Sequence, residues 1–143
     1  MKDRLTFLVA VVGIAIGCDQ QRALPYKTPP IGSYKSETHQ VKIGDAVDSI
    51  LVAIVVPGFF RSAEIRPLLG RLFVDGDFLS SSAPVAVLSH DLWAGHFASA
   101  RTVIGQEIEI DAGRVLVLGV MPPEFNFPKG TQLWIPQRPG SAP

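Results

Sequence analysis

Two unbroken apolar runs in the middle of the chain predict its central strands. Residues 49–56, SILVAIVV, are rich in β-branched side chains and contain no polar position after Ser49. Residues 84–89, PVAVLS, form a second, shorter run of the same kind. Such runs are typical of strands whose two faces are both covered by other parts of a protein. The sequence therefore predicts two buried strands.

A third region alternates apolar and polar residues. Within residues 106–121, QEIEIDAGRVLVLGVM, Ile108 and Ile110 alternate with two glutamates. The residues DAG at 111–113 then separate this stretch from an apolar return over 115–120. Alternation followed by a short turn that contains glycine predicts an antiparallel hairpin.

Two short helices are predicted between the strands. Residues 57–66, PGFFRSAEIR, predict a helix that starts at Pro57, because proline suits the first helical turn. Residues 90–98, HDLWAGHFA, predict a second helix, and residues 73–83 a loop. Strands outnumber helices, so we expect an α+β domain, with a small mixed β-sheet and about two short helices on it.

The N-terminus predicts a signal peptide or a membrane anchor over residues 1–18, MKDRLTFLVAVVGIAIGC. As a helix, the apolar stretch 5–17 would span about 20 Å, short of the ~30 Å hydrocarbon core, which suits a secretory signal. Its end, AIGC, resembles a bacterial lipobox, so Cys18 is the expected lipidation site. The alternative is an uncleaved signal anchor in which Cys18 is incidental. Both interpretations make membrane lipid a partner and place the remaining chain at the cell membrane, facing the periplasm or the outside.

The rest of the chain divides into three parts. Residues 19–44 are polar and interrupted by prolines and a glycine, which predicts an extended Pro-rich tether. Residues 45–136 are expected to form the folded core domain. Residues 137–143, QRPGSAP, have the composition of a disordered tail.

Charge and cysteine content exclude several functions. The chain has 13 basic and 13 acidic residues and no basic stripe interleaved with aromatic residues, so nucleic acid is not an expected partner. Cys18 is the only cysteine, which rules out an internal disulfide and a cysteine-based zinc site. The sequence contains no G-x-x-x-x-G-K-[ST] loop, so we expect no nucleotide, and it suggests no other cofactor.

Ser89, His90 and Asp91 stand in a row and raise the question of a hydrolase triad. A triad needs the imidazole between the hydroxyl and the carboxylate, which adjacent residues cannot easily provide because their side chains diverge. No G-x-S-x-G elbow surrounds Ser89. We expect Ser89 to be the N-cap of the following helix and Asp91 to lie in its favourable first turn. The sequence therefore predicts no catalytic residue.

The other polar candidates are more simply explained as surface residues. His90 and His96 lack the i, i+4 spacing of a helical metal site. Asp75 and Asp77 lack the further carboxylates of a calcium loop. We expect solvent-facing positions for the remaining charged pairs, which are Arg66 and Arg71, and Glu107 and Glu109.

Four stretches of the chain, spread over residues 50–136, resemble the periplasmic core domain of MacB-like ABC permeases. The likeness is greatest to the ATPase-lacking, duplicated permeases related to MacB and FtsX. In chain order the stretches are VPGFFRSAEIRPLLGRLF, APVAVLSHDLWAGHF, VIGQEIEIDAGRVLVLGVMP and EFNFPKGTQLWIP. Glu64 stands where that family usually has glycine. Ala98, Ala100 and Arg101 replace its usual glycine, aspartate and proline.

The resemblance implies a role without chemistry. In such permeases the domain lies between membrane helices and transmits motion from a cytoplasmic ATPase to partners or cargo outside. We expect this chain to be an orphaned or truncated copy that is not an enzyme and that acts through contacts with envelope or permease proteins. The loop 75–82 and the hairpin turn 111–113 are the expected contact sites.

Two other functions stay open. One is a free-standing lipoprotein that binds a peptide or a lipid, for which an apolar groove lined by Phe59, Phe60 or Trp93 would speak. The other is an envelope hydrolase, which needs a nucleophile and a base from different segments. The sequence offers no such pair.

Overall fold

The computed structural model describes residues 25–111 and 113–139, so Cys18 and the predicted signal or anchor segment lie outside the described residues. Within these residues seven strands form a mixed sheet, accompanied by two short α-helices, which confirms the predicted α+β class. No helix within the described ranges is long and apolar enough to cross a membrane. The strands are β1 (Tyr34–Ile43), β2 (Ala46–Val55), β3 (Leu69–Gly70), β4 (Val85–Leu88), β5 (Glu107–Ile110), β6 (Gly113–Val120) and β7 (Leu133–Pro136). The helices are α2 (Phe59–Ala63), α3 (His90–His96) and the 3-10 helices η1 (Asp75–Phe78) and η2 (Arg101–Val103).

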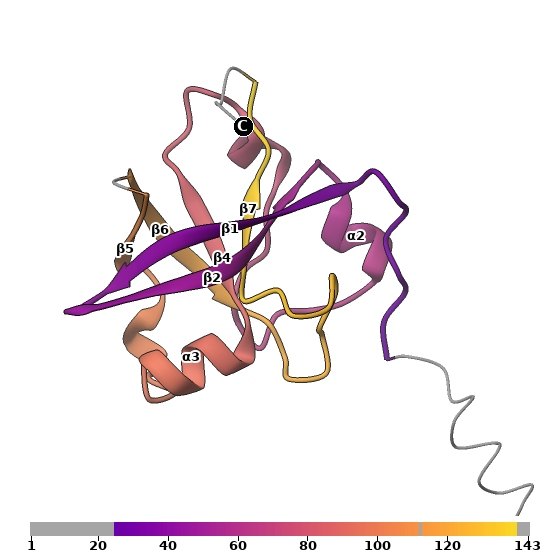
Figure 1. Cartoon of the computed structure of the whole chain (residues 1–143). Coiled ribbons are helices and arrows are strands. Elements are labelled where there is room, and N and C mark those ends of the chain that lie inside the picture. Colours follow the sequence, from indigo (N-terminus) through magenta and orange to yellow (C-terminus); the bar gives the residue numbers. More distant parts are fainter. Residues whose placement is uncertain (1–24, 112, 140–143) are drawn as a thin grey trace, which may run out of the picture.

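Six of the described strands form a closed ring of hydrogen-bonded neighbours. The sheet order is β3-β6-β4-β7-β2-β1-β5, and β5 also pairs with β6, so the ring closes at β6 while β3 pairs with β6 outside it. β2 and β7 are parallel, as are β4 and β6, whereas the other pairs are antiparallel. Figure 1 shows the long β1–β2 hairpin crossing in front of the shorter strands, with α2 and α3 on different sides. The closing contact of β1 with β5 is short, because only Val41 and Lys42 take part on the β1 side.

Both faces of the central strands are buried, as the apolar runs predict. One cluster contains Ile50 and Val52 from β2 and is covered by Leu92 and Trp93 of α3. The opposite cluster contains Ala53 and Val55 from the same strand. It is covered by α2 and by aromatic side chains, namely Phe59, Phe60, Phe78, Phe125 and Trp134. Alternate residues of one strand therefore enter two different cores, which explains why the run 49–56 has no polar period.

The tether prediction is wrong for residues 34–43, which form the ten-residue strand β1. Val41 is the only fully buried residue of β1, while most of its other side chains are exposed or half-buried and polar. Such a strand has no apolar alternation to reveal it, and it is specified by its full-length pairing with β2. The folded part of the chain therefore begins well before residue 45.

The short helices differ from prediction at their ends. α2 begins at Phe59 and not at Pro57, because Gly58 lies in the left-handed region with φ of 89°. Its C-cap is Glu64, which adopts the left-handed conformation (φ 52°) although it is not glycine. Ala98 and Ser99 after α3 also have positive φ, and Ala100 accepts a hydrogen bond from the Trp93 indole at 2.9 Å. The left-handed backbone of both turns is thus formed by residues other than glycine.

A close crossing of β3 and β6 leads into the loop that contains η1. Gly70 faces Gly119 across the two strands, and a Cβ on Gly70 would lie 2.0 Å from the carbonyl oxygen of Leu118. Only glycine allows this approach. The next residue, Arg71, donates its backbone N–H to Leu118 at 3.1 Å, which fixes the start of the loop.

Candidate functional site

Ser89 has the geometry of a helix cap and not that of a nucleophile. Its Oγ accepts a hydrogen bond from the backbone N–H of Leu92 at 3.0 Å, and its own backbone is extended before α3 begins. The His90 ring packs edge-on against Trp93, with centroids 5.5 Å apart. No hydrogen bond links the hydroxyl, the imidazole and the Asp91 carboxylate in a chain, and the hollow beside them has only about 60 Å³. That volume suits one or two water molecules rather than a substrate.

The other histidines do not form a metal site among the described residues, where no group of three potential ligands comes together. His96 on α3 instead pairs with Asp48 on β2, with 3.1 Å between Nε2 and Oδ2. His90 and His96 are thus engaged with different partners.

His39 was not singled out from the sequence, yet it joins the hairpin turn to β1. Its Nδ1 contacts the Asp111 carboxylate, and its Nε2 lies 3.1 Å from Glu37 Oε2. The other oxygen of Asp111 accepts the backbone N–H of Gln40 at 3.1 Å. The His39 hydrogen bond, together with the one from Gln40, lowers the pKa of Asp111. His39 and Asp111 are 72 positions apart, so no local pattern could have linked them.

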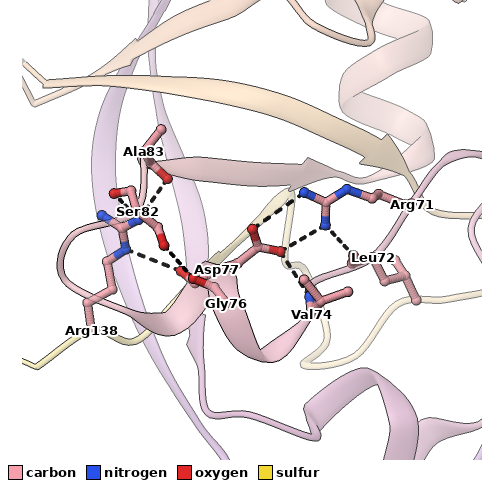
Figure 2. Close-up of polar contacts among 8 residues, drawn as sticks. All are labelled: Arg71, Leu72, Val74, Gly76, Asp77, Ser82, Ala83 and Arg138. Atoms are coloured by element: carbon pink, nitrogen blue, oxygen red, sulfur yellow. Dashed lines mark hydrogen bonds and ion pairs between the residues drawn. The ribbon is translucent and has the colours of Figure 1, made fainter.

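The loop after β3 is organised around the Asp77 carboxylate (Figure 2). Arg71 donates Nη1 to Asp77 Oδ2 at 2.9 Å and Nη2 to Oδ1 at 3.4 Å. The Val74 backbone N–H also donates to Oδ2 at 2.9 Å, which closes the turn that begins η1. Asp77 is only 8% exposed. Arg71 lies at the surface as expected, with its side chain 51% exposed, but its pairing with the buried Asp77 was not predicted.

Arg138, near the C-terminus, also donates hydrogen bonds to this loop. Its Nε donates to the Asp77 carbonyl at 3.3 Å, and Nη2 donates to the carbonyls of Ser82 and Ala83. Gln137 donates its backbone N–H to Val55 at 2.7 Å. The prediction of a disordered tail over 137–143 is wrong for these two residues, while residues 140–143 lie outside the described part of the chain.

Opposing effects set the charge state of Asp77. Burial works to raise the pKa of its carboxyl, but the Arg71 side chain and the Val74 N–H more than offset this, with a further contribution from the charge of Arg138. The net result is a pKa below the ordinary value. Asp77 therefore stays ionised at neutral pH and holds its hydrogen bonds.

Two hollows both have Phe78 in their lining. The first has about 190 Å³ and is lined mainly by apolar side chains, among them Phe59, Phe60 and Phe73. The second, of about 370 Å³, is lined by Val56, Pro57, Phe78, Gln137, Arg138 and Pro139. Val74 and Leu79, which flank η1, are 55% and 56% exposed although they are apolar. We call η1, these two residues and the hollows beside Phe78 the loop surface.

The loop surface lies on a fold that matches a known family. The sequence model of the MacB-like periplasmic core domain matches residues 20–142. The chain belongs to this family. The match confirms the resemblance drawn from the four sequence stretches, and it extends on both sides of the predicted core.

Solved structures of two transporter domains share the fold. One is the extracellular domain of the noncanonical ABC-type transporter YknZ from Gram-positive bacteria, at TM-score 0.60 and 18% identity over 73% of this chain and 52% of that one. The other is the periplasmic region of MacB from Actinobacillus actinomycetemcomitans, at TM-score 0.60 and 17% identity over 83% of this chain and 52% of that one. This MacB-like chain thus spans about half the length of these structures. No protein in the curated set matches it.

Proposed function

We propose that the chain is a non-enzymatic extracytoplasmic module of MacB-like permease type, which acts through protein contacts in transport-related envelope complexes. The family match and the likeness to the YknZ and MacB domains support an extracytoplasmic place at a membrane. Anchoring through residues 1–18, with lipid on Cys18, belongs to the same proposal. Replacing Cys18 with serine is expected to abolish labelling by a fatty-acid analogue in cells, and an unlabelled wild-type chain would contradict the lipid anchor.

The loop surface is the single observation that carries the contact role. Two apolar side chains, Val74 and Leu79, stay exposed on a backbone that Asp77 and Arg138 hold in one arrangement. A pre-ordered surface loses little conformational entropy when a partner binds, so few apolar contacts can suffice for recognition. Ser89, in contrast, uses its hydroxyl as a cap and leaves no nucleophile–base pair at that site.

Site-specific photo-crosslinking of the full chain in its native membrane tests this role. A crosslinker at Leu79 or Asp75 is expected to capture a permease subunit of the envelope. A crosslinker at Thr102, which is also exposed but lies on η2, is the matched control and should not capture it. Equal capture from Leu79 and Thr102 would contradict the proposed surface. Hydrolysis of a generic ester that is lost in a folded Ser89→Ala variant would contradict the non-enzymatic role.

A second candidate, binding of a peptide or lipid, is favoured by the hollow that Phe59 and Phe60 line. Its volume of about 190 Å³ is smaller than the roughly 300–1,000 Å³ of typical ligand pockets. Both phenylalanines are also almost fully buried, at 2% and 6% exposure, and belong to the core cluster. The adjoining hollow at Pro57 would have to accommodate most of such a ligand. Saturable binding of a fluorescent fatty acid, lost in a Pro57→Trp variant, would favour this function over the first.

A further inference from the structure

One edge of β1 carries backbone groups that lack a partner among the described residues. Ser33 accepts the backbone N–H of Val56 at 3.0 Å, so odd-numbered residues of β1 direct their N–H and C=O groups toward β2. Even-numbered residues direct theirs to the other side, where Gln40 accepts the N–H of Asp111 at 3.0 Å. β5 pairs only with Val41 and Lys42, and Figure 1 shows β1 running far beyond it.

The free edge therefore consists of Tyr34, Ser36 and Thr38. Each offers an outward N–H and an outward C=O, which is the arrangement that another strand needs in order to join a sheet. The pairing of β1 with β2 has no register shift, and the edge segment contains no proline. Two of the usual obstacles to strand addition, a bulge and a proline, are thus missing from this edge.

We propose that this edge pairs antiparallel with the same edge of a second copy of the chain, in a register centred on Ser36. Outward-facing residues must then meet outward-facing residues, so Ser36 faces Ser36 and Tyr34 faces Thr38. The residues between them bring Lys35 of each copy opposite Glu37 of the other. Lys35 and Glu37 already form an ion pair within one chain, with 2.7 Å between Nζ and Oε1, so this register joins the two pairs into a cluster of alternating charges, which favours it.

Neighbouring registers are worse for identifiable reasons. Centring the pair on Lys35 or on Glu37 places two like charges directly opposite each other, which is destabilising. Centring it on Thr38 requires the outward groups of Gln40, which are already bonded to Asp111. The charges of β1 thus oppose unspecific strand addition and select one self-complementary arrangement. Only three residues per copy take part in the ladder, so we expect a weak dimer.

Cysteine pairing in the full chain, kept in its native membrane, tests the register. In a hydrogen-bonded antiparallel pair the two Cα atoms are about 5.5 Å apart, within the range of a disulfide, so Ser36→Cys should form a covalent dimer on mild oxidation. Thr38→Cys is the matched control, because two copies of this position would be roughly 13 Å apart along the strands. The wild-type chain, with Cys18 as its one cysteine, gives the background.

Charge exchange then tests the selectivity in the Ser36→Cys chain. E37K alone should raise the dimer dissociation constant roughly tenfold, because it sets lysine against lysine twice. The exchange K35E/E37K should restore the dimer, while thermal unfolding shows that each variant is folded. The proposal would be overturned if Thr38→Cys dimerised as strongly as Ser36→Cys, or if neither variant dimerised. It would also be overturned if the charge exchange did not restore the dimer, or if the disulfide formed with a different protein. None of these results depends on the loop surface, so the proposed function is tested separately.

Discussion

The loop surface and the hairpin turn are each held by one aspartate, but the two carboxylates lie in different surroundings. Asp77 is almost buried and accepts hydrogen bonds from the Arg71 side chain and from the backbone of its own loop. The Asp111 side chain is 48% exposed and contacts His39 at the surface. The partners are exposed the other way round, with the Arg71 side chain 51% and the His39 side chain 19% exposed, so the two contacts differ in the burial of the carboxylate. The two loops are therefore expected to differ in stability although the same residue type holds them.

This difference separates the two contact sites that the sequence predicts. At the loop surface, removing Arg71 leaves the buried Asp77 carboxylate without its charged partner, which is unfavourable. At the hairpin turn, water can reach the Asp111 carboxylate and replace His39 at little loss. The loop surface thus has a fixed shape before any partner arrives, and the hairpin turn is easier to deform.

The largest effect is expected from Asp77→Asn, which preserves size but removes the charge. The Arg71 guanidinium loses its ionic partner and Val74 loses a strong acceptor, so the free energy of unfolding should fall by about 2–3 kcal/mol. This figure allows for the partly exposed Arg71 side chain. Urea unfolding of the full chain, followed by tryptophan fluorescence, measures it.

Asp75→Asn is the matched control, because Asp75 lies in the same 3-10 helix and is exposed. It should change the free energy of unfolding by less than about 0.5 kcal/mol. Equal losses in both variants would show that the negative charge on η1, rather than the buried Asp77 contact, stabilises the fold.

Acid should remove the contribution of Asp77. The folded state lowers the pKa of this carboxyl below its unfolded value, so the unfolded chain binds the proton more readily. The stability that Asp77 contributes is thus fully present above about pH 4 and is lost as pH falls through the folded pKa. Unfolding measured between pH 7 and pH 3 should show a shallower loss for Asp77→Asn than for the wild type. Parallel curves would contradict the assignment.

A smaller loss is expected from Arg138→Met, which keeps the apolar stem and removes the donors. Three carbonyl groups of the loop lose their charged partner, but two of them belong to Ser82 and Ala83, which are partly accessible to water. The free energy of unfolding should fall by about 1–2 kcal/mol. Arg101→Met, at an exposed arginine on η2, should have little effect. A loss in Arg101→Met as large as in Arg138→Met would mean that overall charge explains the result.

The parts of the fold that were predictable from sequence are those that depend on local pattern. The runs 49–56 and 84–89 are strands because their alternate residues enter two apolar cores, and the alternation of Ile108 and Ile110 with glutamates marks a strand at the β5–β6 hairpin. The cap at Ser89 follows from its place between a strand and an amphipathic helix.

The remaining features depend on contacts between distant residues. β1 has polar side chains on both faces and is a strand because β2 pairs with its whole length. Arg138 lies in a stretch with the composition of a tail, yet it bonds to a loop more than 50 positions earlier. From sequence Asp77 looks like an ordinary turn residue. Its hydrogen bonds from Arg71 and from the Val74 backbone N–H make it the centre of the loop. Local composition carries no information on such pairings.

The cap at Ser89 should contribute less than Arg138, because it provides a single neutral hydrogen bond. Ser89→Ala is expected to lower the free energy of unfolding by about 1 kcal/mol. Ser89→Asp should largely restore it, since aspartate can also cap and suits the positive end of α3. Unfolding of the domain by Ser89→Asp together with a neutral Ser89→Ala would show that the hydroxyl does not act as a cap.

The smallest effect is expected at the hairpin turn, from Asp111→Asn. Asp111 has a positive φ of 46°, which asparagine tolerates as well as aspartate does, so the substitution removes the charge without straining the backbone. The His39 contact is exposed on the Asp111 side, and the free energy of unfolding at pH 7 should therefore fall by less than about 1 kcal/mol. His39→Gln, combined with Asp111→Asn in a double-mutant cycle, should give a coupling energy equally small. Both aspartates have a lowered pKa and both are changed to the same amide, so the experiments compare a buried carboxylate paired with Arg71 and a half-exposed one paired with His39. A loss at Asp111 that equals the loss at Asp77 would mean that burial does not set the strength of these contacts, and that the hairpin turn is as rigid a surface as the loop around η1.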